Sequence, residues 1–153
     1  MKKYWLMKCE PNAYSIDDLE KDGVTDWNGV RNYQARNFMM KEMKVGDLAI
    51  YYHSNATPPG AAGIMTICKE AYPDSSARDK KSKYYDPKAC DEKPIWYHVD
   101  VSFVKKFDRY VSLKEIRETP SLSDMMLLKR GMRLSIQPIT KKHFDTISKM
   151  GNL

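Results

Sequence analysis

Apolar and polar side chains alternate in several short runs of this chain, which is the pattern of half-buried β-strands. The alternation is clearest over residues 96–104, where aromatic and β-branched side chains occupy every second position. Because successive side chains of a strand point to opposite faces, this run predicts a strand with one buried face. Similar alternation, or a run of strand-forming residues, predicts further strands over residues 3–8, 48–53, 61–72 and 132–137.

Helices are predicted where apolar residues recur every three or four positions behind a capping side chain. Ser15 with Asp18, and Ser112 with Glu115, have the spacing of a capping box, and Gly131 has the place of a left-handed helix end. The predicted helices lie over residues 15–21, 33–43, 112–115, 121–130 and 140–150.

Strands separated by short helices predict an α+β domain on a small, barrel-like sheet, with residues 1–153 forming one unit. A doubly wound α/β fold fits this pattern poorly. Dinucleotide and triphosphate sites are not expected, because no GxGxxG or GxxxxGK[ST] turn is present. Gly63 within a predicted strand indicates a bulge or a close backbone approach. The polar segment 73–94 has no clear periodicity, and its length is typical of a functional or mobile loop.

The balance of charge favours a polyanionic partner. Lysine and arginine number 26 against 20 aspartates and glutamates, which gives a net charge of +6 and a pI near 9.1. Such an excess favours nucleic acid through counterion release. The longest apolar run is too short to span a bilayer, and no secretion signal is visible, so no membrane partner is expected.

The three cysteines predict a reducing compartment rather than a disulfide framework, because they are odd in number and widely spaced. We therefore expect the cytoplasm, or the nucleus if the source is eukaryotic. Cysteines and histidines lack the paired spacing of a zinc site, so neither a metal nor a cofactor is expected. Cys9 could pair with His53 or His98 as nucleophile and base, but no catalytic signature surrounds them and no enzymatic activity is expected.

The segment with the clearest binding chemistry is WNGVRNYQARN, residues 27–37. An indole offers a stacking face to any base, while arginine, asparagine and glutamine have fork geometries that read base edges or hold phosphate oxygens. The structural alternative is a turn followed by a polar-faced helix, with Trp27 in the core. Basic residues of the 78–88 loop could hold the phosphates of a bound strand.

Seven segments carry a resemblance to a known family, and their order and spacing agree with it over nearly the whole chain. They are WLMKCEP at 5–11, YSIDDL at 14–19, WNGVRN at 27–32, YHSN at 52–55, EAYPD at 70–74, YDP at 85–87 and RLSIQP at 133–138. On these segments the chain resembles the EVE-domain family of the PUA-like superfamily, and within it the thymocyte nuclear protein group.

The resemblance implies a PUA-like mixed β-barrel of about five to six strands flanked by short helices, related in fold to the YTH readers of methylated adenine. It also implies a non-enzymatic module that accepts a flipped, modified base into an aromatic and polar pocket. The implied partner is nucleic acid, DNA rather than RNA, with modified cytosine as the base. No cofactor is implied, and a monomer is expected.

The family's pocket motif maps onto residues spread along the whole chain. Trp27 is expected to stack on the base, Arg31 and Asn32 to contact its edge or the adjoining phosphate, and Tyr85 to close the pocket from the long loop. The residues at the pocket mouth, 53–55, are expected to add polar contacts. The implied base-binding set is Lys8, Trp27, Val30, Arg31, Asn32, Tyr52, His53, Ser54, Asn55, Tyr85, Arg133 and Ser135. The expected phosphate contacts are Arg36, Arg78, Lys80, Lys81 and Lys83.

Two alternative functions use the same pocket: a reader of modified RNA and a sensor of a free nucleotide or other small molecule. One departure from the family pattern is Cys9, where many relatives carry serine. If this position contacts the ligand, a hydroxyl donor has been replaced by a weaker thiol.

Overall fold

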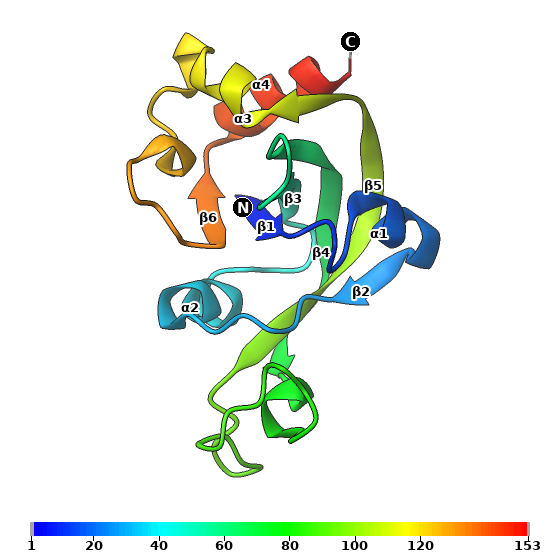
Figure 1. Cartoon of the computed structure of the whole chain (residues 1–153), viewed down its shortest axis with the longest axis vertical. Helices are drawn as coiled ribbons and strands as arrows, with labels where there is room; N and C mark the ends of the chain where they lie inside the picture. Colours follow the sequence, from blue (N-terminus) through cyan, green and yellow to red (C-terminus); the bar gives the residue numbers. More distant parts are fainter. Residues whose placement is uncertain (1, 153) are drawn as a thin grey trace.

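The computed structural model describes residues 2–152, and a six-stranded mixed sheet runs through it (Figure 1). The strands are β1 (Tyr4–Cys9), β2 (Val24–Asp26), β3 (Leu48–His53), β4 (Gly60–Pro73), β5 (Tyr97–Ser112) and β6 (Ile136–Ile139). Their order is β2-β5-β4-β3-β1-β6, with β1 and β3 parallel and every other pair antiparallel. The α+β class is confirmed. Among the described residues, β2 and β6 are the two edge strands, and each has a hydrogen-bonded neighbour on one side only. The sheet is therefore not closed, and the barrel description is only approximate.

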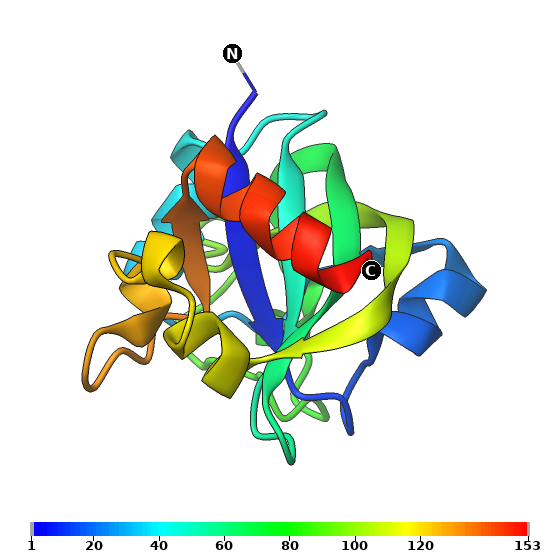
Figure 2. The same ribbon diagram turned by 90° about the horizontal axis from the view of Figure 1, so that it is seen from above.

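Within residues 2–152, four α-helices pack around the sheet: α1 (Ile16–Asp22), α2 (Tyr33–Lys41), α3 (Leu113–Arg117) and α4 (Lys141–Gly151). The predicted capping boxes of α1 and α3 are both formed, since Ser15 and Ser112 each accept from the backbone three residues later. Figure 2 shows α4 lying across the strands on one face of the sheet. No helix in the part of the chain described here is long and apolar enough to cross a membrane.

The predicted helix over residues 121–130 is wrong, because only the short 3₁₀ turns η2 (Pro120–Leu122) and η3 (Met126–Leu128) form there. The buried side chains in this segment are Leu122, Met125 and Leu127, and a spacing of three and then two does not keep to one face of a helix.

The strand predicted over residues 132–137 is observed at residues 136–139 instead. Pro138 lies within it, opposite Trp5. Proline is tolerated there because β6 is an edge strand. Strand β2 was not predicted, since three residues are too few to show a period, and β5 continues well past residue 104 to Ser112.

The two faces of the sheet carry separate apolar clusters, and the alternation along β3 divides two neighbouring tyrosines between them. Tyr51 packs with Trp5, Trp27 and the residues beneath α2, whereas Tyr52 packs with Phe144 of α4 and the residues of the opposite face. Tyr52 is 3% exposed. Because adjacent strand positions face opposite ways, the Tyr52 ring packs on the opposite face of the sheet from Trp27.

Candidate functional site

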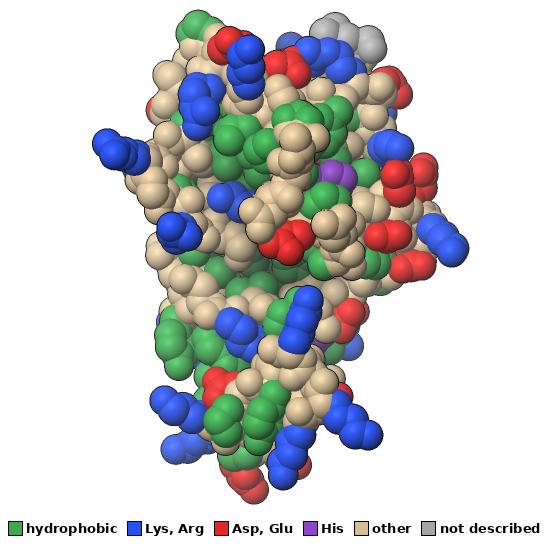
Figure 3. Space-filling view, in the orientation of Figure 1, with side chains coloured by type: hydrophobic (Ala, Val, Ile, Leu, Met, Phe, Trp, Pro, Cys, Tyr) green, Lys and Arg blue, Asp and Glu red, His purple; other side chains and the backbone are tan. Residues whose placement is uncertain are grey.

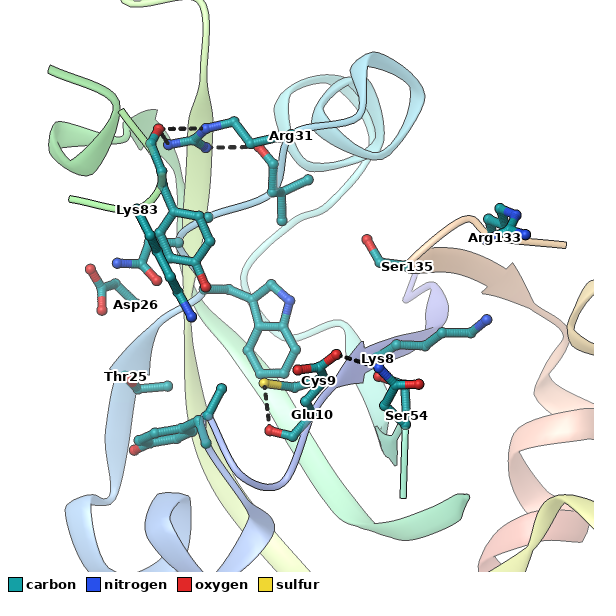
Figure 4. Close-up of a pocket in the computed structure, with 18 residues that line it drawn as sticks. Lys8, Cys9, Glu10, Thr25, Asp26, Arg31, Ser54, Lys83, Arg133 and Ser135 are labelled. Carbon is teal, nitrogen blue, oxygen red and sulfur yellow. Dashed lines mark hydrogen bonds between the residues drawn. The ribbon is translucent and has the colours of Figure 1, made fainter. Parts of the chain in front are cut away.

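A pocket of about 960 Å³ opens where the parallel strands β1 and β3 both end. This volume lies within the range of ligand-binding clefts. Figure 4 shows Lys8, Ser54, Ser135 and Arg133 on one side of Cys9 and Glu10, with Thr25, Asp26 and Lys83 on the other. The remaining lining comes from Ala13, Tyr14, Trp27, Asn28, Gly29, Val30, Arg31, Asn55 and Tyr84.

Trp27 forms part of the pocket wall, although its side chain is 7% exposed. Its backbone N–H donates to the carbonyl of Val99 at 2.8 Å, which ties the residue to the sheet directly after β2. The indole lies edge-on to the ring of Tyr51, with centroids 5.3 Å apart and planes at 83°. The indole is therefore held rigidly by the core while part of it faces the cavity.

Arg31 lines the same pocket, but its guanidinium is occupied by protein acceptors. Its Nε and Nη2 donate to the carbonyl of Tyr84 at 3.0 and 2.8 Å, and its Nη1 donates to Oδ2 of Asp74 at 3.1 Å. Further bonds reach the Val30 carbonyl and the Ser76 hydroxyl. These contacts fasten the 74–84 segment to the loop after Trp27, so Arg31 shapes the pocket rather than presenting a free base-reading fork.

Asp74 is the buried anion of this arrangement, with a side chain that is 1% exposed. Burial opposes its ionisation, but hydrogen bonds from Ser76, the Gly29 backbone and Arg31 outweigh burial and hold the pKa of Asp74 below its usual value. A paired, hydrogen-bonded carboxylate of this kind stays charged at neutral pH.

Tyr84 covers the pocket from the long loop, in the place where Tyr85 was expected. Gly29 has a left-handed backbone with φ of 81°, and a Cβ there would meet the Tyr84 ring at 2.5 to 2.7 Å. Only glycine allows this close approach of ring and backbone. Tyr85 is 37% exposed and does not line the pocket.

The other wall is polar, with cations and carboxylates close together. Burial lowers the pKa of Lys8, whose Nζ lies 6.0 Å from the centre of the Tyr52 ring. Glu10 accepts from the side-chain amide of Asn55 at 2.7 Å. Cys9 has its thiol pKa raised by burial, so the neutral thiol predominates at neutral pH.

Four residues of the expected base-binding set lie outside the pocket, each for a local reason. Asn32 caps α2 by accepting from the Ala35 backbone at 2.9 Å. His53 accepts at Nε2 from the Ile16 backbone at 3.2 Å, and burial lowers its pKa. The other two are Tyr52 and Tyr85. The pocket does bring together Lys8, Trp27, Val30, Arg31, Ser54, Asn55, Arg133 and Ser135.

The expected phosphate contacts divide in a similar way. Arg36 donates to the Ile95 carbonyl at 2.9 Å and to the Asn37 amide, and Arg78 pairs with Asp91. Lys80 and Lys81 are exposed, while Lys83 lines the pocket.

Several lining residues were not expected from the motif, chiefly Glu10, Tyr14, Thr25, Asp26 and Tyr84. Glu10 and Tyr14 belong to two of the family segments, so the sequence contained a signal that could have placed them in the pocket. Tyr84 had none, because its inward direction depends on contacts to Gly29 and Arg31, far away in sequence.

Groups of three or more histidine, cysteine, aspartate or glutamate side chains arranged to hold a metal ion are not found among residues 2–152. Cys9 and His53 are register partners on β1 and β3, but no hydrogen bond joins their side chains within that part of the chain.

The chain matches a known protein family over almost its whole length. A model of the EVE domain matches residues 3–150. This chain belongs to the EVE domain family. The resemblance read from the seven sequence segments is thereby confirmed.

The EVE domain described here is similar to human thymocyte nuclear protein 1, with 42% identity over 96% of this chain and 73% of that protein. A hypothetical protein from Leishmania major has a similar structure, with a TM-score of 0.94 and 44% identity over 99% of this chain and 95% of that one. A structure of the human protein in complex with DNA containing 5-methylcytosine has a TM-score of 0.89 and 40% identity, covering 99% of each chain.

Proposed function

We propose that this EVE domain binds DNA and recognises a modified cytosine, 5-methylcytosine before others, without performing chemistry on it. The observation that carries the proposal is the open pocket beside Trp27, on a fold shared over 99% of its length with a human protein solved in complex with 5-methylcytosine DNA. We further propose that residues 1–153 act as one unit and as a monomer.

The pocket has the groups that a cytosine ring requires. Trp27 offers a rigid aromatic surface, and each base-aromatic stack contributes about 1 to 3 kcal/mol, enough to offset the few kcal/mol needed to extrude a base. Glu10 and Asp26 supply acceptors for the exocyclic amine that distinguishes cytosine from thymine. Lys8 and Arg133 supply donors for the ring's acceptor atoms.

The DNA backbone is proposed to lie along the basic rims of the pocket. Figure 3 shows lysine and arginine side chains on both sides of a hollow between the main body and the lower lobe. Lys83 lines the pocket, and the exposed Lys80 and Lys81 precede it in the same loop, so these three lysines suit phosphate contacts. Arg36 and Arg78 are less suited, since their guanidinium groups already bond within the protein.

Such a protein acts where DNA is, so we propose the cytoplasm of a prokaryote or the nucleus of a eukaryote. The name of the human relative describes that protein as nuclear.

The decisive experiment compares matched oligonucleotides by fluorescence anisotropy. Duplexes with cytosine, 5-methylcytosine, 5-hydroxymethylcytosine or N6-methyladenine at one position are titrated, together with an RNA strand and the free modified nucleosides. Preference for the 5-methylcytosine duplex supports the proposal, and Trp27→Phe should reduce that preference while weak general binding remains. Equal, salt-sensitive binding to all the polymers would exclude selective recognition. Tight binding of a free nucleoside, unchanged by Lys80→Ala, would instead show a small-molecule sensor.

A further inference from the structure

An aromatic stack lies outside the pocket, where α2 meets the start of β5 (Figure 1). The ring of Tyr33 stacks on that of Trp96, with centroids 4.8 Å apart and planes inclined by 22°. Trp96 is buried and its indole N–H donates to Asp86 at 2.7 Å, so the inner ring is fixed. Tyr33, by contrast, is 57% exposed. A firmly backed and exposed ring can stack a second flat group.

Arg36 leaves the outer face of Tyr33 open. Its guanidinium carbon lies 4.8 Å from the centroid of the Tyr33 ring and 5.9 Å from that of Trp96. With the two ring centroids 4.8 Å apart, a guanidinium on the outer face of Tyr33 would lie much farther than 5.9 Å from Trp96. Arg36 therefore lies beside both rings, held there by the Ile95 carbonyl, and adds positive charge at the edge of the stack.

The stack is continuous with the pocket through Arg31. This residue lines the cavity, and its guanidinium carbon lies 5.3 Å from the centroid of Trp96. Tyr33 follows it by two positions in the chain. The cationic aromatic surface therefore adjoins the side of the pocket that Arg31 forms.

We propose that the outer face of Tyr33 is a second stacking site, which takes an unpaired nucleobase next to the captured one on the same strand. The site rests on the proposed function, because its occupant belongs to the strand held at the pocket. A nucleobase fits the surface because every base has a flat π face, and the positive charge of Arg36 beside the stack favours an anionic strand without a direct phosphate contact. The site requires no base-edge hydrogen bonds, so it adds affinity without adding sequence preference.

The test uses a single-stranded oligonucleotide with one 5-methylcytosine and with 2-aminopurine, which loses fluorescence when stacked, at each neighbouring position in turn. Wild-type protein and Tyr33→Phe, which keeps the ring, should quench one of these positions. Tyr33→Leu should abolish the quenching and weaken binding about tenfold. Its preference for 5-methylcytosine over cytosine should be unchanged, since the pocket is intact. Tyr33→Gln, a good helix former, is the second variant in case the leucine form unfolds.

Wild-type quenching at no neighbouring position, or equal binding by wild type and both ring-less variants, would overturn the stacking site. If the preference for 5-methylcytosine persists in that case, the proposed function still stands. If the wild-type protein binds neither these single strands nor the 5-methylcytosine duplex, both proposals fall together.

Discussion

The guanidinium of Arg31 lies 3.1 Å from the carboxylate of Asp74, although 43 positions separate the two residues in the chain. The same carboxylate oxygen accepts from the Gly29 backbone N–H at 2.9 Å, and the Arg31 guanidinium also donates to the Tyr84 carbonyl. One buried ion pair therefore joins the loop that carries Trp27 to the loop that carries Tyr84. The side of the pocket that Trp27 and Tyr84 form depends on it.

Replacing Arg31 by lysine should loosen this junction. A lysine ammonium cannot bridge the Tyr84 carbonyl and the Asp74 carboxylate as the planar fork does, so we expect the free energy of unfolding to fall by about 2 kcal/mol. Urea unfolding measures the change. Arg130→Lys is the matched control, because Arg130 is exposed and should be unaffected. Equal stability of the two variants would show that the ion pair does not hold the loops.

Acid should weaken the protein through Asp74. Because the folded state holds the pKa of this carboxylate below its unfolded value, its stabilising contribution is complete at neutral pH and is lost as the pH falls through the folded pKa. We expect wild type to begin losing stability below about pH 5, where an unfolded aspartate begins to take up protons. Asp74→Asn should be less stable at neutral pH and lose less on acidification.

The comparison is made by urea unfolding at neutral and at acid pH. Other carboxylates with lowered pKa, such as Asp124, contribute equally to both proteins and cancel in the difference. Parallel pH profiles for the two proteins would contradict the role given to Asp74.

Removing the basic rim should change the salt dependence of DNA binding. If Lys80, Lys81 and Lys83 each contact a phosphate, their joint replacement by alanine should reduce the slope of log K against log salt by about 2 to 3. Anisotropy titrations at several salt concentrations measure this slope. A control triple variant at Lys21, Lys114 and Lys149, which do not line the pocket, should leave it almost unchanged. Equal losses in both variants would indicate only a general charge effect.

Ligand binding should protect Cys9 from alkylation. The thiolate is the reactive form, and burial raises the pKa of Cys9, so we expect slow reaction with iodoacetamide in the free protein. A bound 5-methylcytosine oligonucleotide should slow it further, because Cys9 lines the pocket. The exposed Cys68 and Cys90 provide internal controls in the same mass-spectrometric measurement. Unchanged labelling of Cys9 at saturating DNA would place the ligand elsewhere.

The sequence predicted the elements whose signals are local. The capping boxes at Ser15 and Ser112 are formed as expected, since cap and partner lie three positions apart on one short segment. The helix predicted over residues 121–130 does not form, because the buried side chains of this segment pack into the apolar cluster beneath α4 and do not recur with a helical period.

Much of the lining of the candidate site was predictable from the sequence, but the hydrogen-bond partners of its side chains were not. Trp27 and Arg31 stood out by residue type, yet the acceptors that occupy the Arg31 guanidinium come from the 74–84 segment. Tyr52 and Tyr85 of the implied set are each adjacent in the chain to the tyrosine that contacts a pocket residue. Tyr51 packs against Trp27, and Tyr84 covers Gly29.

By itself the sequence determined the family, the α+β class and the positive charge, because these depend on residue types and spacings along the chain. Tertiary structure alone decided which of two adjacent tyrosines faces the cavity and whether an arginine is free or bound. Both outcomes depend on contacts between segments distant in the chain, such as the hydrogen bonds from Arg31 to the Tyr84 carbonyl.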